Sequence, residues 1–308
     1  MCYGRRAMRV AAVAIALSFV AGALAPPAHA GNATGAAAPY EDLVEVLATL
    51  TWHLHDDLYR FPPPKDPTGR DLYKLSLTRL ESWEKRFPGR LRDVTAFGRA
   101  EALEHLGEYK RAVEAYGQVA AIPDSPLAPK ARDAATKVQP LVDAAALPET
   151  GDGVEQQLTV LRKKLDAWGT LVTRCEGTPC ESLARVEEER LERATAGLVV
   201  DHRLDLEHGD ATAEQALRFL IQKHADSKNL AAHVLRLGDL YADLAHEYLA
   251  AHDRPLAFDE DEFVRRADRA LETYHKVATW DGAKEKPEGQ ARFTAVEAWK
   301  SATLARYR

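Results

Sequence analysis

A stretch of ten residues occurs twice in this chain with nearly the same pattern. Residues 111–120 read RAVEAYGQVA, and residues 269–278 read RALETYHKVA. In both copies, small and aromatic residues recur three to four positions apart, which is the spacing of one face of an α-helix. A recurring helical face is typical of proteins built from repeated helical units. We therefore expect this chain to fold into an all-α repeat protein.

The first thirty residues have the features of an export signal. A basic start, an apolar run and a small-x-small cleavage site follow one another: Arg5, Arg6 and Arg9, then residues 10–25, then Ala28-His29-Ala30. We expect residues 1–30 to be removed and residues 31–39 to form a flexible tail. A retained anchor is the alternative, although the apolar run is short for a membrane span. The expected location is the periplasm, with secretion from the cell as the other possibility.

The expected mature chain is acidic. Removing residues 1–30 takes away three arginines and no acids, which changes the formal charge from −6 to −9. A protein that binds nucleic acid needs a basic face for the phosphates, so the charge argues against such a partner. No later segment is apolar enough for a membrane span, and we find no cofactor motif. We expect a basic or neutral protein partner.

Two cysteines remain after the expected cleavage, Cys175 and Cys180. An even number of cysteines in an exported chain predicts a disulfide. Residues five apart do not face each other on a straight helix, so the bridge requires a break, which Gly177-Thr178-Pro179 supplies. The loop is short, so its stabilisation is about 2 kcal/mol or less, and its role is to fix a turn between helices. A redox site is the alternative, but its usual spacing is C-x-x-C.

Helical periodicity extends over the rest of the chain and predicts ten or eleven helices. We expect the first over about residues 40–60, a loop over 61–69, and a second helix over about 71–87. Pro148, Gly151 and Gly153 mark a further break. We take that break as the limit between an N-terminal helical region, 40–147, and a C-terminal helical region, 148–308.

The spacing of helix ends agrees with a known repeat. Phe87-Pro88 and Ile122-Pro123 are 35 residues apart, and Asp124-Ser125 and Asp226-Ser227 are 102 apart, three times 34. A period of 34 residues is that of the tetratricopeptide (TPR) repeat. Residues at the positions of that motif are Ala100, Leu106, Gly107, Tyr109, Ala112, Tyr116 and Ala120, and then Leu237, Gly238, Tyr241, Ala270 and Tyr274. About half of the expected mature chain therefore resembles the TPR family, in particular exported bacterial cell-envelope TPR proteins.

The resemblance implies a right-handed superhelix of helical hairpins with a concave groove. Residues 138–208 keep helical periodicity without the motif, and about twenty residues are inserted between Tyr241 and Ala267, so we expect irregular, elongated helices in the middle and C-terminal part. In the family, the first helix of each pair lines the groove. The matching positions here are Phe97, Glu101, Glu104, His105, Leu235, Asp239 and Asp243. Their acids would suit a basic or polar peptide. We expect charge reversal at Glu101 and Asp239 to weaken capture of the partner without lowering the melting temperature.

Other residues suggest chemistry only weakly. His53 and Asp57 share a helix face at four-residue spacing and could hold a metal. His246-Glu247 lacks the second histidine of a zinc-protease helix. The acids of 259–262 suit a helix start, and the charged run 185–193 suits a solvated, self-paired helix face. The exposed faces of tryptophans could bind glycan or cell-wall material: Trp52, Trp83, Trp168, Trp280 and Trp299.

The sequence thus predicts an exported TPR-like adaptor or scaffold of the cell envelope that binds a protein or peptide, with no enzymatic activity and no metal or other cofactor. A helical metal-dependent hydrolase whose site is assembled from distant residues is the alternative. Binding of glycan or cell-wall material is a second one.

The export signal can be tested directly. We expect the protein purified from exporting cells to begin at Gly31, because Ala30 ends the cleavage site. Intact mass spectrometry measures this end. A purified protein that still carries residues 1–30 would contradict the prediction.

Overall fold

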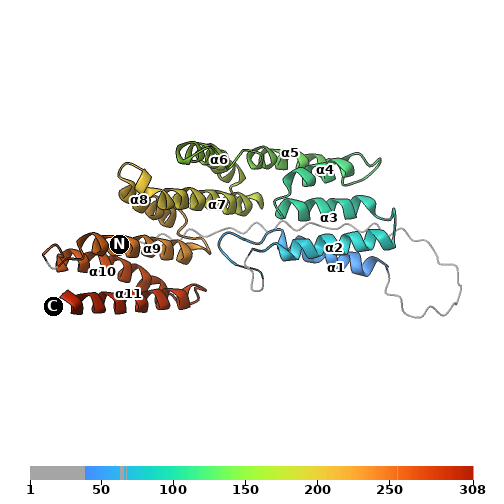
Figure 1. Ribbon diagram of the computed structural model, residues 1–308. Helices are drawn as coiled ribbons and strands as arrows, with labels where there is room; N and C mark the ends of the chain where they lie inside the picture. Colours follow the sequence, from blue (N-terminus) through green and yellow to red (C-terminus); the bar gives the residue numbers. More distant parts are fainter. Residues whose placement is uncertain (1–38, 63–65, 67, 255, 308) are drawn as a thin grey trace, which may run out of the picture. The chain divides into compact units, whose positions relative to one another are not determined.

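The computed structural model describes residues 39–62, 66, 68–254 and 256–307, and every regular element in these ranges is helical. The expected all-α class is confirmed (Figure 1). The eleven α-helices and one 3-10 helix of the described residues are α1 (Pro39–His53), α2 (Asp71–Arg86), α3 (Arg92–His105), α4 (Tyr109–Ala120), α5 (Ala128–Ala145), α6 (Val154–Cys175), α7 (Cys180–Asp201), η1 (Arg203–Asp205), α8 (Gly209–Lys223), α9 (Leu230–His252), α10 (Glu260–Ala278) and α11 (Lys286–Tyr307). The expected export signal and residues 31–38 of the expected tail lie outside the described residues.

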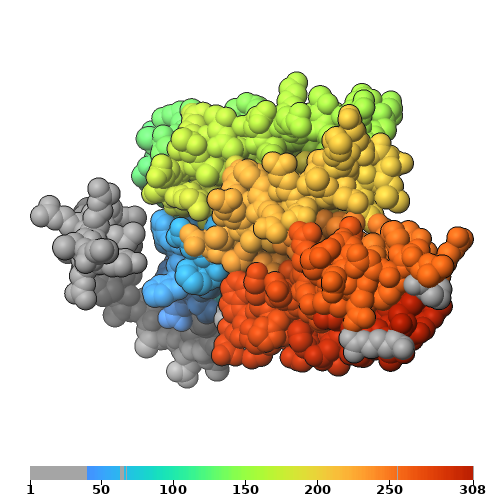
Figure 2. Space-filling model, turned by 90° about the vertical axis from the view of Figure 1, so that its left-hand side faces the viewer, coloured from blue at the N-terminus to red at the C-terminus, as the bar shows by residue number. Residues whose placement is uncertain are grey.

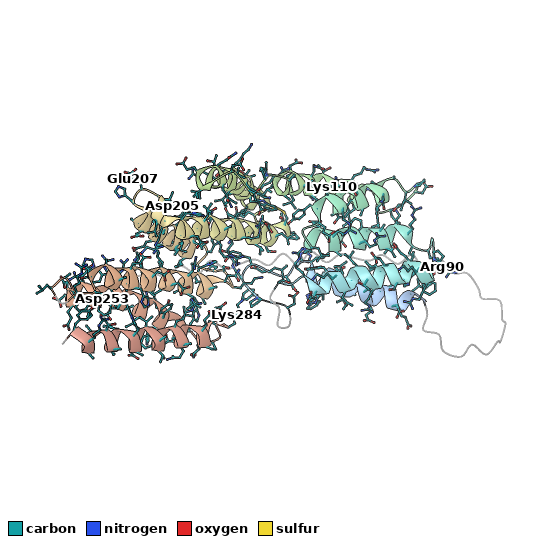
Figure 3. All side chains as sticks on the ribbon, in the orientation of Figure 1. Arg90, Lys110, Asp205, Glu207, Asp253 and Lys284 are labelled. Carbon is teal, nitrogen blue, oxygen red and sulfur yellow. A yellow bond between two sulfur atoms is a disulfide. The ribbon has the colours of Figure 1, made fainter. Side chains whose placement is uncertain are left out.

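Each helix packs mainly against the helices that precede and follow it in the chain. From α2 onward, short connections join each helix to the next. The turns that hold Asp205, Glu207 and Asp253 lie at one end of the C-terminal helices, and the turn that holds Lys284 lies at the other end (Figure 3). Charged side chains at such turns stay in water while the helix faces are buried.

Helix α10 shows why these residues form a packed helix. Its buried side chains recur every three or four residues: Phe263, Ala267, Ala270, Tyr274 and Val277, all at most 3% exposed. Asp259 precedes the helix, and its side chain accepts a hydrogen bond from the Glu262 N–H (3.0 Å), which satisfies one of the free amides of the first turn. The helix begins at Glu260, three residues before Phe263, the first buried side chain of this face.

The two copies of the repeated decapeptide occupy equivalent places in α4 and α10. Ala112 and Ala270 are fully buried, so the neighbouring helix can approach closely. In both copies the tyrosine hydroxyl donates to a carboxylate of the preceding helix. Tyr116 donates to Glu104 Oε2 (2.9 Å), and Tyr274 donates to Asp239 Oδ1 (2.7 Å).

The first helix is shorter than expected. It ends at His53 instead of near Arg60. Beyond this point side chains compete with the helix for backbone groups. The Asp57 carboxylate accepts from the N–H groups of Tyr59 (3.2 Å) and Arg60 (3.1 Å), and His53 Nδ1 pairs with Asp56 Oδ2 (2.5 Å). The described residues between His53 and Asp71 therefore form no regular helix, and α2 begins where the sequence predicts.

The expected disulfide is confirmed. Cys175 ends α6 and Cys180 begins α7, with their Cα atoms 5.5 Å apart. Gly177 supplies the break with φ +73°, a left-handed conformation that favours glycine. The bridge therefore fixes the turn between the two longest helices of the middle of the chain.

Two large apolar clusters form the core, and α7 contributes to both. Leu191 belongs to a cluster built from α3 to α7, whereas Ala196, Val199 and Val200 belong to a cluster built from α7 to α11. The region limit expected at 147/148 falls in the loop between α5 and α6. Among the described helices, none is both long enough and apolar enough to cross a membrane.

Gly238 tests the close packing of α9 on α10. A Cβ at this position would lie 2.6 Å from Cε1 of Tyr274, whose hydroxyl is held by Asp239. We expect Gly238→Ala to lower the free energy of unfolding by about 1–3 kcal/mol, measured by urea denaturation. The matched control is Gly117→Ala on α4, where a Cβ meets nothing within 4 Å, and there we expect a gain of about 1 kcal/mol. Equal effects of the two changes would contradict the packing argument.

Candidate functional site

Three glutamates of α7 are buried, although the sequence predicts a solvated face there. Glu188, Glu189 and Glu192 are 7%, 2% and 6% exposed. Buried carboxylates require partners, since an unpaired charge inside a protein is costly. Their partners come from α8, from α9 and from the loop between these two helices, so the expectation of a solvated, self-paired face is wrong for these three glutamates.

Glu189 is held by three residues at the start of α9 and before it. His233 Nε2 lies 2.6 Å from Glu189 Oε1, the Ser227 hydroxyl donates to the same oxygen (2.5 Å), and the Asn229 amide donates to Oε2 (3.1 Å). Burial alone would raise the pKa of the Glu189 carboxyl, but the hydrogen bonds from His233 and Ser227 outweigh it and lower the pKa below its usual value. Glu189 therefore stays ionised at neutral pH.

Glu192 connects α8 to the loop after α1. Its Oε2 lies 2.8 Å from His224 Nε2, and His224 Nδ1 lies 2.8 Å from the Tyr59 hydroxyl. Lys223 donates to Glu188 Oε1 (2.8 Å) and also contacts Glu192. Burial raises the pKa of Tyr59, and the charge of Glu189 raises it further, so the tyrosine keeps its proton.

The same loop is fixed by backbone contacts. The Lys228 N–H donates to the Tyr59 carbonyl (3.0 Å), and Lys228 Nζ donates to the Leu58 carbonyl (2.5 Å). Leu58 is buried in a cluster with Tyr73 of α2 and Leu183 of α7. The contacts of Lys228 and His224 with this loop join residues more than 160 positions apart, so they tie the beginning of the helical region to its C-terminal half.

This cluster does not have the geometry of a catalytic site. Nucleophilic catalysis by serine needs a base that accepts the hydroxyl proton, and the base needs a third group that orients it. Here the Ser227 hydroxyl and His233 both bond the same Glu189 oxygen, so no hydrogen bond joins serine to histidine. All of these groups are buried, and the cluster is a structural junction.

A small open pocket of about 140 Å³ lies beside the junction. Its lining comes from the loop after α1 and from the disulfide turn: His55, Asp56, Asp57, Tyr59, Arg60, Thr178, Pro179, Glu181, Ser182 and Arg185. His53 and Asp57, weighed above as metal ligands, are on different elements, and His53 pairs with Asp56 instead. Within the described ranges, no three His, Cys, Asp or Glu side chains are arranged to hold a metal.

In α3, most of the residues that the sequence predicts to line a groove already make contacts within the protein. Phe97 is 5% exposed, packs edge-on against Tyr116 and lies under Lys130, whose Nζ is 4.4 Å from the ring centroid. Lys130 also pairs with Glu101 (3.7 Å). His105 is bonded to the carbonyl oxygens of Leu54 and Glu101, both at 3.2 Å.

The matching residues of α9 differ in exposure. Leu235 is 4% exposed and belongs to the core. Asp239 accepts from Tyr274 and pairs with Arg292 of α11. Asp243 is exposed, although partial desolvation of its carboxylate by the surrounding protein raises its pKa. The acids of this face are thus mostly paired within the protein, and the role of the face in binding stays a prediction.

Because Glu101 and Asp239 are paired and partly buried, we now expect their charge reversal to lower the melting temperature.

An open groove lies on a different face of α9, between α8 and α10. Its floor comes from α9, and its rims come from the two flanking helices. The groove consists of two adjoining hollows of about 500 and 260 Å³, and Tyr241 and Arg269 line both. The lining residues are Arg218, Ile221 and Gln222 of α8, Val234, Leu237, Tyr241 and Leu244 of α9, and Glu262, Arg265, Arg266, Arg269, Glu272, Thr273 and Lys276 of α10. We call this surface the α8–α10 groove. The helices that form it belong to the yellow-to-red surface of Figure 2.

The rims of the α8–α10 groove carry more cations than acids. Glu214 is shared by two arginines, with its Oε1 2.8 Å from Arg218 and 2.6 Å from Arg269. Glu262 is likewise shared by Arg265 and Arg266. Burial opposes the ionisation of Glu214, but the arginine contacts lower its pKa below the usual value. With Lys276 and Glu272 included, five cations face three acids in a chain of net charge −6.

The comparisons with known proteins do not add a family. No family model matches this chain, and none of the curated proteins is a significant match to it. The assignment of a function therefore depends on the residues and their geometry.

The tryptophans divide between core and surface. Trp83 and Trp168 are 1% exposed and belong to the core, whereas Trp52 is 78% and Trp280 39% exposed. Trp299 lies against His246, with ring centroids 3.8 Å apart. Trp52 lies in the last turn of α1 and Trp280 lies in the turn after α10, so they belong to different elements.

Glu104 provides a test of how these carboxylates behave. Burial raises the pKa of its carboxyl to about 7, although the Tyr116 hydrogen bond opposes the rise. The folded protein therefore binds more protons than the unfolded chain between about pH 4.5 and 7, and stability falls as the pH rises through this range. We expect Glu104→Gln to remove this loss. The variant should gain about 2 kcal/mol relative to the parent between pH 5 and 8, a value reduced for partial exposure.

Urea denaturation at the two pH values measures the effect, and Glu114→Gln, at an exposed glutamate of α4, is the matched control. A stability difference between Glu104→Gln and the parent that does not change with pH would show that Glu104 is not buried in this way.

Proposed function

We propose that this chain is an interaction adaptor that binds a segment of another protein in the α8–α10 groove. The groove itself carries the proposal. It combines an apolar floor with charged rims, which is the usual make-up of a surface that recognises peptides. The buried junction around Glu189 supports the proposal indirectly, because it holds the flanking helices in place without offering reactive groups to a substrate.

The floor residues of the groove can contribute a small amount of binding energy, because the fold already covers most of their surface. Val234, Leu237 and Tyr241 are 9%, 8% and 4% exposed, and they lie between the rims of α8 and α10. A partner side chain that covers them removes the remaining apolar surface from water, at about 25 cal/mol per Å². The charged rims add orientation and selectivity more than affinity.

We further propose that the helix pairs are TPR-like units. The equivalent tyrosine-to-carboxylate contacts in α3–α4 and α9–α10 support this reading, as does packing between sequence neighbours. Stacked units of this kind expose long surfaces, which is why such arrays commonly serve as scaffolds. The first-helix face, with Asp243 exposed, is a second candidate surface within the same proposal.

We also propose that the adaptor works outside the cytoplasm, in the periplasm or beyond the cell. The basic start, apolar run and cleavage pattern of residues 1–30 support this. The Cys175–Cys180 disulfide agrees with an oxidising compartment.

Site-specific photocrosslinking in the native cell tests the adaptor. Gln222 is an exposed, uncharged residue on the rim of the groove, and Gln118 is an exposed glutamine of α4 that does not line it. We expect benzoylphenylalanine at position 222 to capture one or two discrete proteins by mass spectrometry, and the same group at position 118 to capture none of them. A third variant, with the group at Asp243, examines the first-helix face.

The outcomes separate the candidate surfaces. Capture from position 243 alone would move the site to the first-helix face. No specific capture from either position would contradict the adaptor.

A further inference from the structure

We infer that the α8–α10 groove recognises an acidic segment of its partner, in which carboxylates alternate with apolar residues. This inference rests on the proposed function, namely that the groove is the partner site. It differs from the expectation drawn from the first-helix acids, which was a basic or polar peptide. Three observations carry it: the shape of the floor, the position of the cations, and the surplus of positive charge.

The floor is an apolar stripe along one side of α9. Val234, Leu237, Tyr241 and Leu244 follow one another at spacings of three, four and three residues, which places them on one face. Ten residues of helix span about 15 Å. A partner segment of about five extended residues covers that length at about 3.3 Å per residue. Its apolar side chains would be the ones that face the floor.

The cations of α10 follow the same line. Arg265, Arg269 and Lys276 lie four and seven residues apart on the side of α10 that lines the groove. Eleven residues of helix span about 16 Å. Side chains on one face of an extended chain are about 6.6–6.8 Å apart, so three alternating carboxylates would come within reach of these three long side chains.

The existing contacts leave donors for a ligand. Arg218 and Arg269 share Glu214, and Arg265 and Arg266 share Glu262. Each of the two carboxylates is thus paired with two guanidinium groups. A guanidinium has five N–H donors, and these contacts use only some of them. Lys276 is exposed, and its ammonium makes no hydrogen bond or ion pair with any described residue.

Charge complementarity selects the occupant. The groove has a surplus of two positive charges, whereas the chain as a whole is negative. A basic segment would meet like charges on both rims, which costs affinity and slows association. An acidic segment is repelled by most of the surface and attracted at this place, so the field of the protein itself would guide it into the groove.

A random heptapeptide library displayed on phage provides an unbiased test. The library is selected on purified full-length protein, and selected peptides are then synthesised with a fluorescent label. Each peptide is crosslinked to protein that carries benzoylphenylalanine at position 222, which locates binding without relying on charge. We expect the peptides that crosslink there to be enriched in Asp and Glu and depleted in Lys and Arg.

Affinity measured by fluorescence anisotropy then tests the contacts. We expect Lys276→Gln to weaken binding about two- to fivefold, as for one exposed ion pair, and Lys276→Glu to weaken it further. Binding should also weaken when NaCl is raised from 50 to 300 mM. The Lys276 ammonium makes no hydrogen bond or ion pair with the described residues, so we expect neither change to disturb folding, which circular dichroism can check. The matched control, Lys163→Gln at an exposed lysine of α6, should leave affinity unchanged.

The result can separate this inference from the function on which it rests. Peptides that crosslink at position 222 without an excess of acids, or with affinity unaffected by Lys276→Glu, would overturn the acidic-segment inference and leave the adaptor intact. If no selected peptide crosslinks at position 222, both the groove as a partner site and the acidic segment are wrong.

Discussion

The buried carboxylates of α7 determine how the rest of the described chain is held together. Each helix packs mainly on its neighbours in sequence, so neighbour packing alone does not join segments that lie far apart in the chain. Glu189 and Glu192 contribute to that connection, together with the Lys228 contacts and the apolar cluster around Leu58, because a buried negative charge must be surrounded by donors. Their hydrogen-bond partners lie in α8, in α9 and between these helices. One of them, His224, also contacts the Tyr59 hydroxyl in the loop after α1. A substitution in this cluster is therefore expected to affect the packing of both the N-terminal and the C-terminal helices.

The same neighbour-by-neighbour packing explains why a groove is open on α9. A helix in such an array is covered by the helix before it and the helix after it, and a stripe between the two contacts can remain accessible. On α9 this stripe is apolar, while α8 and α10 place arginines along its sides. The groove has fewer acidic than basic side chains. Two of its acids, Glu214 and Glu262, are each paired with two arginines. Architecture and charge together thus produce one surface that differs from its surroundings.

Sequence reasoning predicted the helices well where a single helix determines its own pattern. The stripe of α10 and the start of α2 follow from local spacing, and the Cys175–Cys180 bridge follows from its Gly-Thr-Pro break. Sequence reasoning failed where the partner of a side chain lies far away in the sequence. The run 185–193 resembles a solvated face because its charges alternate, yet three of its glutamates are buried by helices far along the chain. The end of α1 was misplaced because Asp57 takes backbone amides that a helix would otherwise use.

The sequence by itself determined the all-α class, the approximate number of helices and the disulfide, since these depend on periodicity, on helix-ending residues and on contacts over five residues. Only the tertiary structure decided which charges are free. Glu101, Glu104 and Asp239 look like exposed groove residues in the sequence, but burial and their contacts with Lys130, Tyr116 and Arg292 occupy them. The groove with surplus cations was not foreseen because its walls come from separate helices. Whether a charge is solvated, paired or buried depends on atoms brought near it by the fold, and the local sequence does not contain that information.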